Sequence, residues 1–121
     1  MVRIWAVLFG IAFIFGGVAG YGVLPDMIKD GLLFGYFEVD AMHNLIHIAT
    51  GVIAIMCATS ATLSKMFFIL FGLIYAAVAG IGFYYDGDMF GMMHMNNADN
   101  FLHTAVAVFA LLIGFNAKTS K

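Results

Sequence analysis

The chain alternates long apolar runs with short polar breaks. An apolar helix needs about 20 residues to cross a bilayer, and four runs approach or reach that length. They cover Ile4 to Leu24, Ala41 to Thr59, Met66 to Tyr85 and Phe101 to Phe115. The breaks are Pro25, the polar stretch Ser60 to Lys65, and the segment Asp86 to Asn97. The fourth run reaches full length only if its helix starts near Asn97. The pattern predicts an all-α protein, an integral membrane four-helix bundle that forms one transmembrane domain over residues 1–121.

The composition agrees with a membrane protein and excludes several other classes. Hydrophobic residues make up 64% of the chain and charged residues 10%, against about 45–50% and about 25% in soluble domains. The net charge of −2 is unsuited to binding a nucleic-acid backbone, which requires many cations. The single cysteine, Cys57, excludes an internal disulfide framework and a zinc site built from cysteines.

The charges predict an orientation in the membrane. Cytoplasmic ends of membrane helices are enriched in Lys and Arg, and four of the five cations lie on one side of a four-span chain: Arg3, Lys65, Lys118 and Lys121. The other side carries Lys29 and all seven acidic residues. Both termini are therefore expected in the cytoplasm.

The second half of the chain repeats motifs of the first. With a shift of 56 residues, five positions match their counterparts: Gly31, Phe34, Gly35, Asn44 and His47 match Gly87, Phe90, Gly91, Asn100 and His103. Upstream, the Val-Ala-Gly-x-Gly element at 18–22 recurs at 78–82, a shift of 60. This recurrence inside the third run also argues against a cleaved signal peptide at the N-terminus. The repeat therefore predicts two tandem helical hairpins, about 4–60 and 65–117, related by a pseudo-two-fold axis along the membrane normal.

Small residues recur at four-residue spacing within the first and third runs. They are Gly16 and Gly20, and Gly72, Ala76 and Gly80. This spacing lets transmembrane helices approach closely, so these residues are expected to pack against neighbouring helices.

Polar side chains share one helical face in the second and fourth runs. Positions three or four apart are neighbours on a helix, which groups His43, Asn44 and His47, and likewise Asp99, Asn100 and His103. Ionisable groups inside a membrane usually mark a functional site. Three imidazoles and a carboxylate suit a transition metal, copper or zinc first. The candidate ligands are thus His43, His47, Asp99 and His103, with Asn44 and Asn100 orienting them through hydrogen bonds.

The loop before the fourth run is rich in soft ligands. Thioethers select Cu(I), so a copper-collecting role is one interpretation of Met89, Met92, Met93, His94 and Met95. Methionine is also a flexible apolar filler, and the same residues could instead cap the end of the bundle.

Two other interpretations of the histidines remain open. His47 and His103 could ligate a b-type haem from two sides, with Gly51 leaving room for the ring. Alternatively, the Asn and His side chains only hold helices together, and the chain is a non-enzymatic structural or accessory subunit. No phosphate-binding loop, serine elbow or cysteine nucleophile is present, so an enzyme is not expected.

The two N-x-x-H motifs support a resemblance. His43-Asn44-Leu45-Ile46-His47 and Asp99-Asn100-Phe101-Leu102-His103 resemble an uncharacterised family of small four-span bacterial membrane proteins, catalogued as a domain of unknown function. The resemblance implies a multi-pass protein of the bacterial cytoplasmic (inner) membrane and assigns no biochemistry. The expected partners are the lipid bilayer and a homo-oligomer or larger membrane complex.

Overall fold

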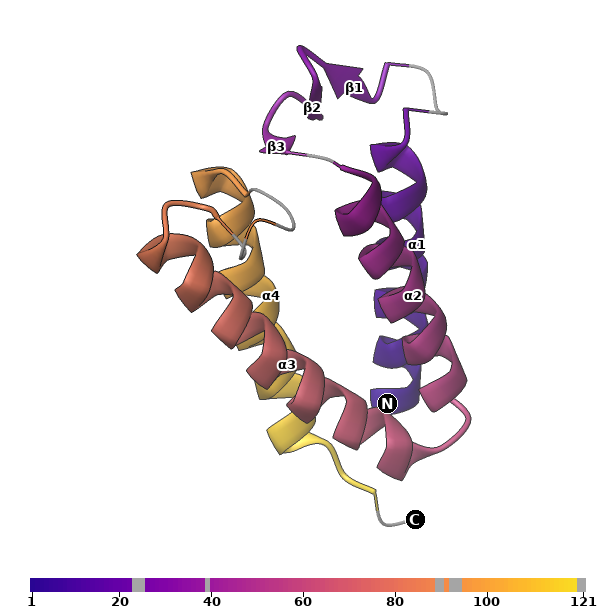
Figure 1. Ribbon diagram of the computed structural model, residues 1–121. Helices are drawn as coiled ribbons and strands as arrows, with labels where there is room; N and C mark the ends of the chain where they lie inside the picture. Colours follow the sequence, from indigo (N-terminus) through magenta and orange to yellow (C-terminus); the bar gives the residue numbers. More distant parts are fainter. Residues whose placement is uncertain (23–25, 39, 89–90, 92–94, 120–121) are drawn as a thin grey trace.

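The computed structural model describes residues 1–22, 26–38, 40–88, 91 and 95–119. Four helices dominate it: α1 (Val2–Gly20), α2 (Ala41–Cys57), α3 (Ala61–Tyr84) and α4 (Asn97–Asn116) (Figure 1). The connection from α1 to α2 adds three two-residue strands, β1 (Ile28–Lys29), β2 (Leu32–Leu33) and β3 (Phe37–Glu38). They form an antiparallel sheet in the order β1-β2-β3. The apolar pattern predicted the four helices and gave no sign of the strands.

Three of the helices are long and apolar enough to cross a membrane: α1, α3 and α4. The 17-residue α2 is apolar but shorter, at the lower limit of the 17–25 residues that spanning helices use. These lengths and compositions indicate a multi-pass membrane protein.

Side chains that cap the helix ends explain where α2, α3 and α4 begin. The backbone N–H of His43 donates to the Asp40 carboxylate at 2.8 Å, and that of Leu63 to the Ser60 hydroxyl at 3.3 Å. Such caps satisfy backbone N–H groups that have no partner inside the helix. The fourth helix starts at Asn97, as its predicted full length required.

The third helix begins five residues before its predicted start, at Ala61. The stretch from Ser60 to Lys65 was read as a break because it is polar, and that reading is wrong. Lys65 lies inside α3 and its Nζ donates to the carbonyls of Gly114 and Ala117, at 2.7 and 2.9 Å. A long side chain can keep its charge at the polar end of a bundle while its stem packs on apolar surface.

The chain forms two hairpins, α1 with α2 and α3 with α4. The contacts between the two helices of the first hairpin recur at equivalent positions in the second. A Cβ added to Gly10 would lie 2.7 Å from the Gly51 carbonyl, and one added to Gly72 would lie 3.2 Å from the Ala107 carbonyl. At the helix ends, Arg3 Nε donates to the Ala58 carbonyl at 2.7 Å, as Lys65 does to Gly114. The first helices of the two hairpins therefore correspond at an offset of 62 residues and the second helices at 56.

The offset of 62 corrects the alignment suggested by the Val-Ala-Gly-x-Gly repeat. A Cβ at Gly20 would overlap the side chain of Asn44, and one at Gly82 would overlap that of Asn100. Gly82, and not Gly80, is therefore the counterpart of Gly20. Among the described residues, a Cβ added at Gly16 or Gly80 would meet no atom of a neighbouring segment within 4 Å, so the prediction that they pack against a helix is wrong, whereas it holds for Gly20 and Gly72.

Aromatic side chains join the two hairpins. Phe9 packs against Phe71 at 5.9 Å between ring centroids, and Phe13 packs against Tyr75 at 5.8 Å. Both pairs are 62 residues apart, so each ring meets its own counterpart in the other hairpin. The helices of the two hairpins lie close together near the chain termini and diverge toward the strands (Figure 1). The candidate site lies at this diverging end.

Candidate metal centre

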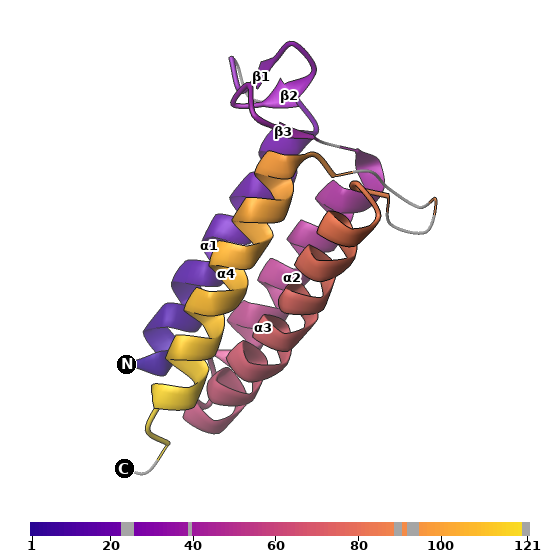
Figure 2. The same ribbon diagram turned by 90° about the vertical axis from the view of Figure 1, so that its left-hand side faces the viewer.

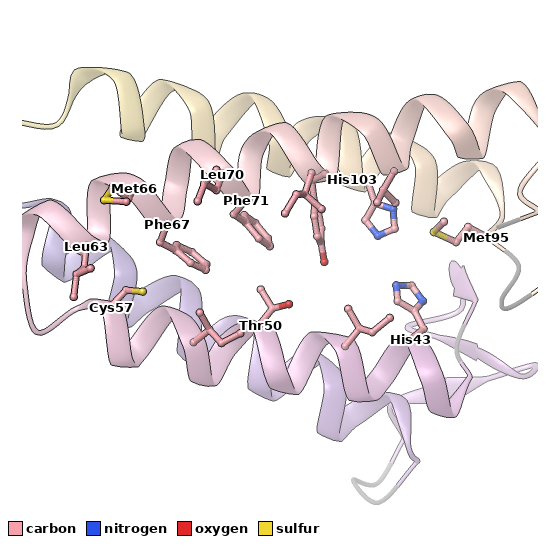
Figure 3. Close-up of a pocket in the computed structure, with 15 residues that line it drawn as sticks. His43, Thr50, Cys57, Leu63, Met66, Phe67, Leu70, Phe71, Met95 and His103 are labelled. Carbon is pink, nitrogen blue, oxygen red and sulfur yellow. The ribbon is translucent and has the colours of Figure 1, made fainter. Parts of the chain in front are cut away.

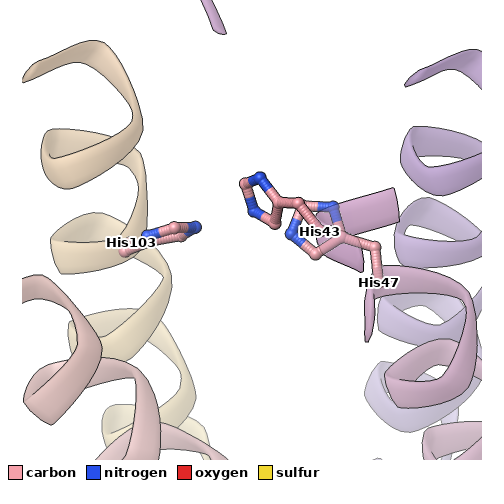
Figure 4. Close-up of side chains that lie close together, drawn as sticks. All are labelled: His43, His47 and His103. Atoms are coloured by element: carbon pink, nitrogen blue, oxygen red, sulfur yellow. The ribbon is translucent and has the colours of Figure 1, made fainter. Parts of the chain in front are cut away.

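Three histidines from two helices meet between the hairpins. His43 and His47 lie in the first two turns of α2, and His103 lies in the second turn of α4. Each offers a ring nitrogen, and these atoms all lie within 4.8 Å of one another. The ring centroids are 4.4 Å apart for His43 and His47, and 5.6 and 6.4 Å from these two rings to His103. Figure 4 shows the His103 ring facing the other two across the space between the hairpins.

The group is shielded from the surroundings and incompletely hydrogen-bonded. His43 is 6% and His103 2% exposed, while His47 is half-buried. The Nδ1 atom of His103 is buried and has no hydrogen-bond partner among the described residues. A buried polar atom without a partner costs about 1–3 kcal/mol, and such cases call for a specific explanation, such as an ion or water. A metal ion is one partner that such a nitrogen can take.

Two aromatic rings frame the histidines in the same way in each hairpin. Phe13 lies edge-on to His47 at 5.3 Å, and Tyr75 lies edge-on to His103 at 5.0 Å. These contacts limit how far the imidazoles can turn, because neighbouring rings occupy the space. The sequence reasoning missed both rings. An alignment of the first and third helices at the offset of 62 would have paired Phe13 with Tyr75.

Asp99 is not part of the group of nitrogens. Its side chain is 1% exposed and accepts a hydrogen bond from the Asn96 backbone N–H at 3.1 Å, while Asn96 Oδ1 accepts one from the Asp99 N–H at 2.9 Å. This reciprocal pair is a capping box that fixes the start of α4. The Asp99 side chain still lines a cavity together with all three histidines.

The two asparagines of the motifs are buried beside glycines. Asn44 packs against Gly20 and Asn100 against Gly82. The Oδ1 atom of Asn100 and the Nδ1 atom of His103 both lack a hydrogen-bond partner in the described part of the chain, so Asn100 does not orient that ring through Nδ1. These close contacts show the asparagines as packing residues between the two helices of each hairpin.

Only one member of the candidate copper-collecting loop can be placed. Met89, Met92, Met93 and His94 lie outside the described residues. Met95 is 1% exposed and lines a cavity together with His43 and His103, as Figure 3 shows. Its thioether is therefore inside the bundle and beside the histidines.

The histidines lie where two cavities adjoin. One, of about 540 Å³, lies between α2 and α3. The other, of about 350 Å³, lies between α1 and α4 and is also lined by Leu33, Phe34 and Phe37. His43 and His103 line both cavities.

The ring positions disfavour a haem between His47 and His103. The His43 ring lies closer to each of these rings than they lie to each other. A porphyrin whose iron sat midway between His47 and His103 would therefore overlap His43. A single ion, which takes several imidazoles at about 2.0–2.1 Å, meets no such obstacle.

The family model described as "Domain of unknown function (DUF4383)" matches residues 3–116. The match confirms the resemblance that the N-x-x-H motifs suggested. No curated protein and no solved structure matches the chain.

Proposed function

The chain belongs to the DUF4383 family, and because this membership assigns no activity, we propose that it binds one transition-metal ion through His43, His47 and His103. The observation that carries the proposal is the convergence of three ring nitrogens within 4.8 Å at a buried position. Neutral imidazole is a ligand for both zinc and copper, and these two metals are the candidates.

Binding would bring the three ring nitrogens closer together. Nitrogens that share a tetrahedral ion at about 2.0–2.1 Å lie about 3.3 Å apart, closer than the 4.8 Å within which the three now lie. His43 and His47 belong to α2 and His103 belongs to α4, so the ion joins one hairpin to the other. Three protein ligands leave a fourth position of a tetrahedral ion open. We assign Asp99 to the helix cap and not to that position.

The equivalent contacts of the two hairpins support the predicted symmetry. His47 and His103 are counterparts at the offset of 56, as Phe13 and Tyr75 are at 62. The start of α1 and the end of α4 lie at the same end of the bundle, opposite the strands (Figure 2). We place the termini and the cation-bearing end in the cytoplasm of a bacterial cell, with the axis along the membrane normal and the histidines toward the outer leaflet.

The proposed role is binding and handling of a metal at the membrane, without catalysis. The structural alternative is that the motifs only join helices, which the packing of Asn44 on Gly20 and of Asn100 on Gly82 favours. Under that alternative the histidines contribute to stability in the absence of metal and bind none.

Metal content separates these two functions. The purified full chain is loaded with zinc or, under reducing conditions, copper(I), dialysed and assayed by mass spectrometry of the metal. We expect one ion per chain and a loss of at least about tenfold in affinity for His103→Gln, which keeps a hydrogen-bonding group and removes a ligand. For zinc, His94→Gln is the matched control, because it removes the one histidine outside the triad; for copper(I) it tests the loop that contains His94. Equal metal content in the two variants, or no metal in the wild type, would refute the proposal.

A further inference from the structure

The larger cavity has an elongated shape that runs along two helices. Its lining residues on α2 extend from His43 to Cys57, which at 1.5 Å per residue is about 20 Å. Its volume of about 540 Å³ falls in the range of pockets that hold small molecules, about 300–1,000 Å³. A long, narrow space of this kind fits an extended chain better than a compact molecule.

The two imidazoles of the cavity lie at one end, while Thr50 lines its middle and Cys57 its other end. The imidazoles of His43 and His103 face each other there, beside Met95 (Figure 3). Along most of its length the walls are apolar, with side chains such as Ile46, Phe67 and Phe71. No Lys, Arg, Asp or Glu lines the cavity within the described ranges. The cavity therefore offers hydrogen bonds to a polar head at one end and no charge to balance an ionised one.

The cavity borders the region where lipid chains would lie. Several of its wall residues on α3 are among the most exposed apolar side chains of the helix, including Met66, Leu70 and Ile74. In a membrane these side chains face the acyl chains, because a spanning helix is surrounded by lipid wherever protein does not cover it. A ligand can therefore enter sideways from the bilayer.

We infer that this cavity binds a single-chain lipid with a neutral carbonyl head, the class that includes long-chain quinones. The carbonyl oxygen lies against the imidazoles of His43 and His103, where an imidazole N–H can donate to it. The chain lies between α2 and α3, with Thr50 near its middle. This site goes beyond the proposed metal binding and does not rest on it, because the imidazole donors are present without an ion.

The smaller cavity is the counterpart of the larger one and does not suit the same ligand. Ile46 and Thr50 of the first correspond to Leu102 and Val106 of the second at the offset of 56. His43 corresponds to Asp99, however, so the second cavity, which the three histidines also line, adds a carboxyl group that the first lacks. A carboxylate only accepts hydrogen bonds and would repel a carbonyl oxygen. We therefore assign one lipid site per chain.

The test uses decylubiquinone as the probe and the full chain after treatment with a chelator. Native mass spectrometry in detergent measures the bound probe as its concentration is raised. We expect saturation at one probe per chain, and about fivefold weaker binding of dodecane, which lacks the carbonyl groups. Palmitate should compete poorly, because its carboxylate would enter a cavity without a cation. Palmitate that displaces the probe at equal concentration would overturn the neutral-head assignment.

Two variants fill the cavity and one serves as the control. Thr50→Phe places a ring in the middle of the cavity. Leu70→Trp fills the cavity from its exposed rim, where a larger side chain does not overpack the protein core. Each should weaken binding by about tenfold or more. Leu73→Phe adds bulk at an exposed position of the same helix outside the cavity lining and should bind as the wild type does. If both filled variants bind decylubiquinone as tightly as the wild type does, the lipid site is refuted. A failure of the chain to bind metal would not by itself contradict the lipid site.

Discussion

A methyl group added at Gly51 tests how the hairpin positions the histidines. Gly51 lies one turn after His47 on α2, and a Cβ there would lie 2.5 Å from the carbonyl oxygen of Gly10 and 2.7 Å from the Ile14 side chain. Side-chain Cβ atoms essentially never approach other atoms closer than 3.0 Å. Because the nearest atom belongs to the backbone, α2 must move away from α1 by at least about half an ångström. Overpacking of this kind costs about 1–3 kcal/mol.

The same displacement should weaken metal binding. It moves His43 and His47 relative to His103 on the other hairpin, and metal–ligand distances tolerate only about 0.2 Å. We expect the metal affinity of Gly51→Ala to fall by about tenfold, the size of effect that lost support around a site produces. Thermal unfolding in detergent measures the stability, and competition with a chromophoric chelator measures the affinity.

Gly16→Ala is the matched control, because a Cβ added at Gly16 would meet no atom of another described segment within 4 Å. This substitution should leave the free energy of unfolding unchanged or raise it by up to about 1 kcal/mol, because alanine favours the helix more than glycine does. The double variant Gly51→Ala with Ile14→Ala copies the second hairpin, where Ala107 and Ala76 stand at the equivalent positions and line one groove. It should recover part of the lost stability. If Gly51→Ala unfolds at the same temperature as Gly16→Ala, the close contact between α1 and α2 is not real.

Three further predictions follow from the caps and the site. Lys65→Met removes two hydrogen bonds to the last carbonyls of α4 and should destabilise the chain by about 1–3 kcal/mol in thermal unfolding, whereas Leu63→Met nearby should not. Asn96→Ala removes half of the capping box and should cost about 0.5–2 kcal/mol, seen as earlier loss of helix by circular dichroism. Zinc at a hundredfold excess over its dissociation constant should stabilise the wild type by about 2.7 kcal/mol. His47→Gln should abolish that gain, and an equal gain in this variant would count against the triad.

The four helices could be predicted from the sequence because the lipid environment imposes one simple rule. A spanning segment must be apolar for its whole length and satisfy its own backbone hydrogen bonds, so apolar runs give four helices with few errors. Lys65 shows where the rule fails: a polar residue at the end of a helix can pair with carbonyls of a neighbour, which is a tertiary contact. The strands β1 to β3 were missed because each has two residues, too few for an alternating pattern.

The repeat predicted that the histidines meet, and it also predicted a fourth ligand. The shift of 56 correctly placed His47 opposite His103, because tandem hairpins bring equivalent turns together. It also suggested Asp99 as a ligand, since Asp99 is the counterpart of His43. In the structure the Asp99 carboxylate accepts a cap hydrogen bond from the Asn96 backbone N–H, a local contact that sequence reasoning did not consider, and its role as a ligand stays a prediction. The sequence did not reveal the offset of 62 between the first helices of the hairpins. The Val-Ala-Gly-x-Gly repeat aligns Gly20 with Gly80, whereas Gly82 is the glycine that contacts an asparagine as Gly20 does.

X-ray absorption spectroscopy of the metal-loaded full chain tests the central claim most directly, because it counts the nitrogens around the ion and measures their distance. The account predicts one ion per chain with three imidazole nitrogens at about 2.0 Å, falling to two in His103→Gln and unchanged in His94→Gln. A shell of oxygen or sulfur without imidazole, or the same spectrum from the wild type and His103→Gln, would contradict a metal site that joins the two hairpins.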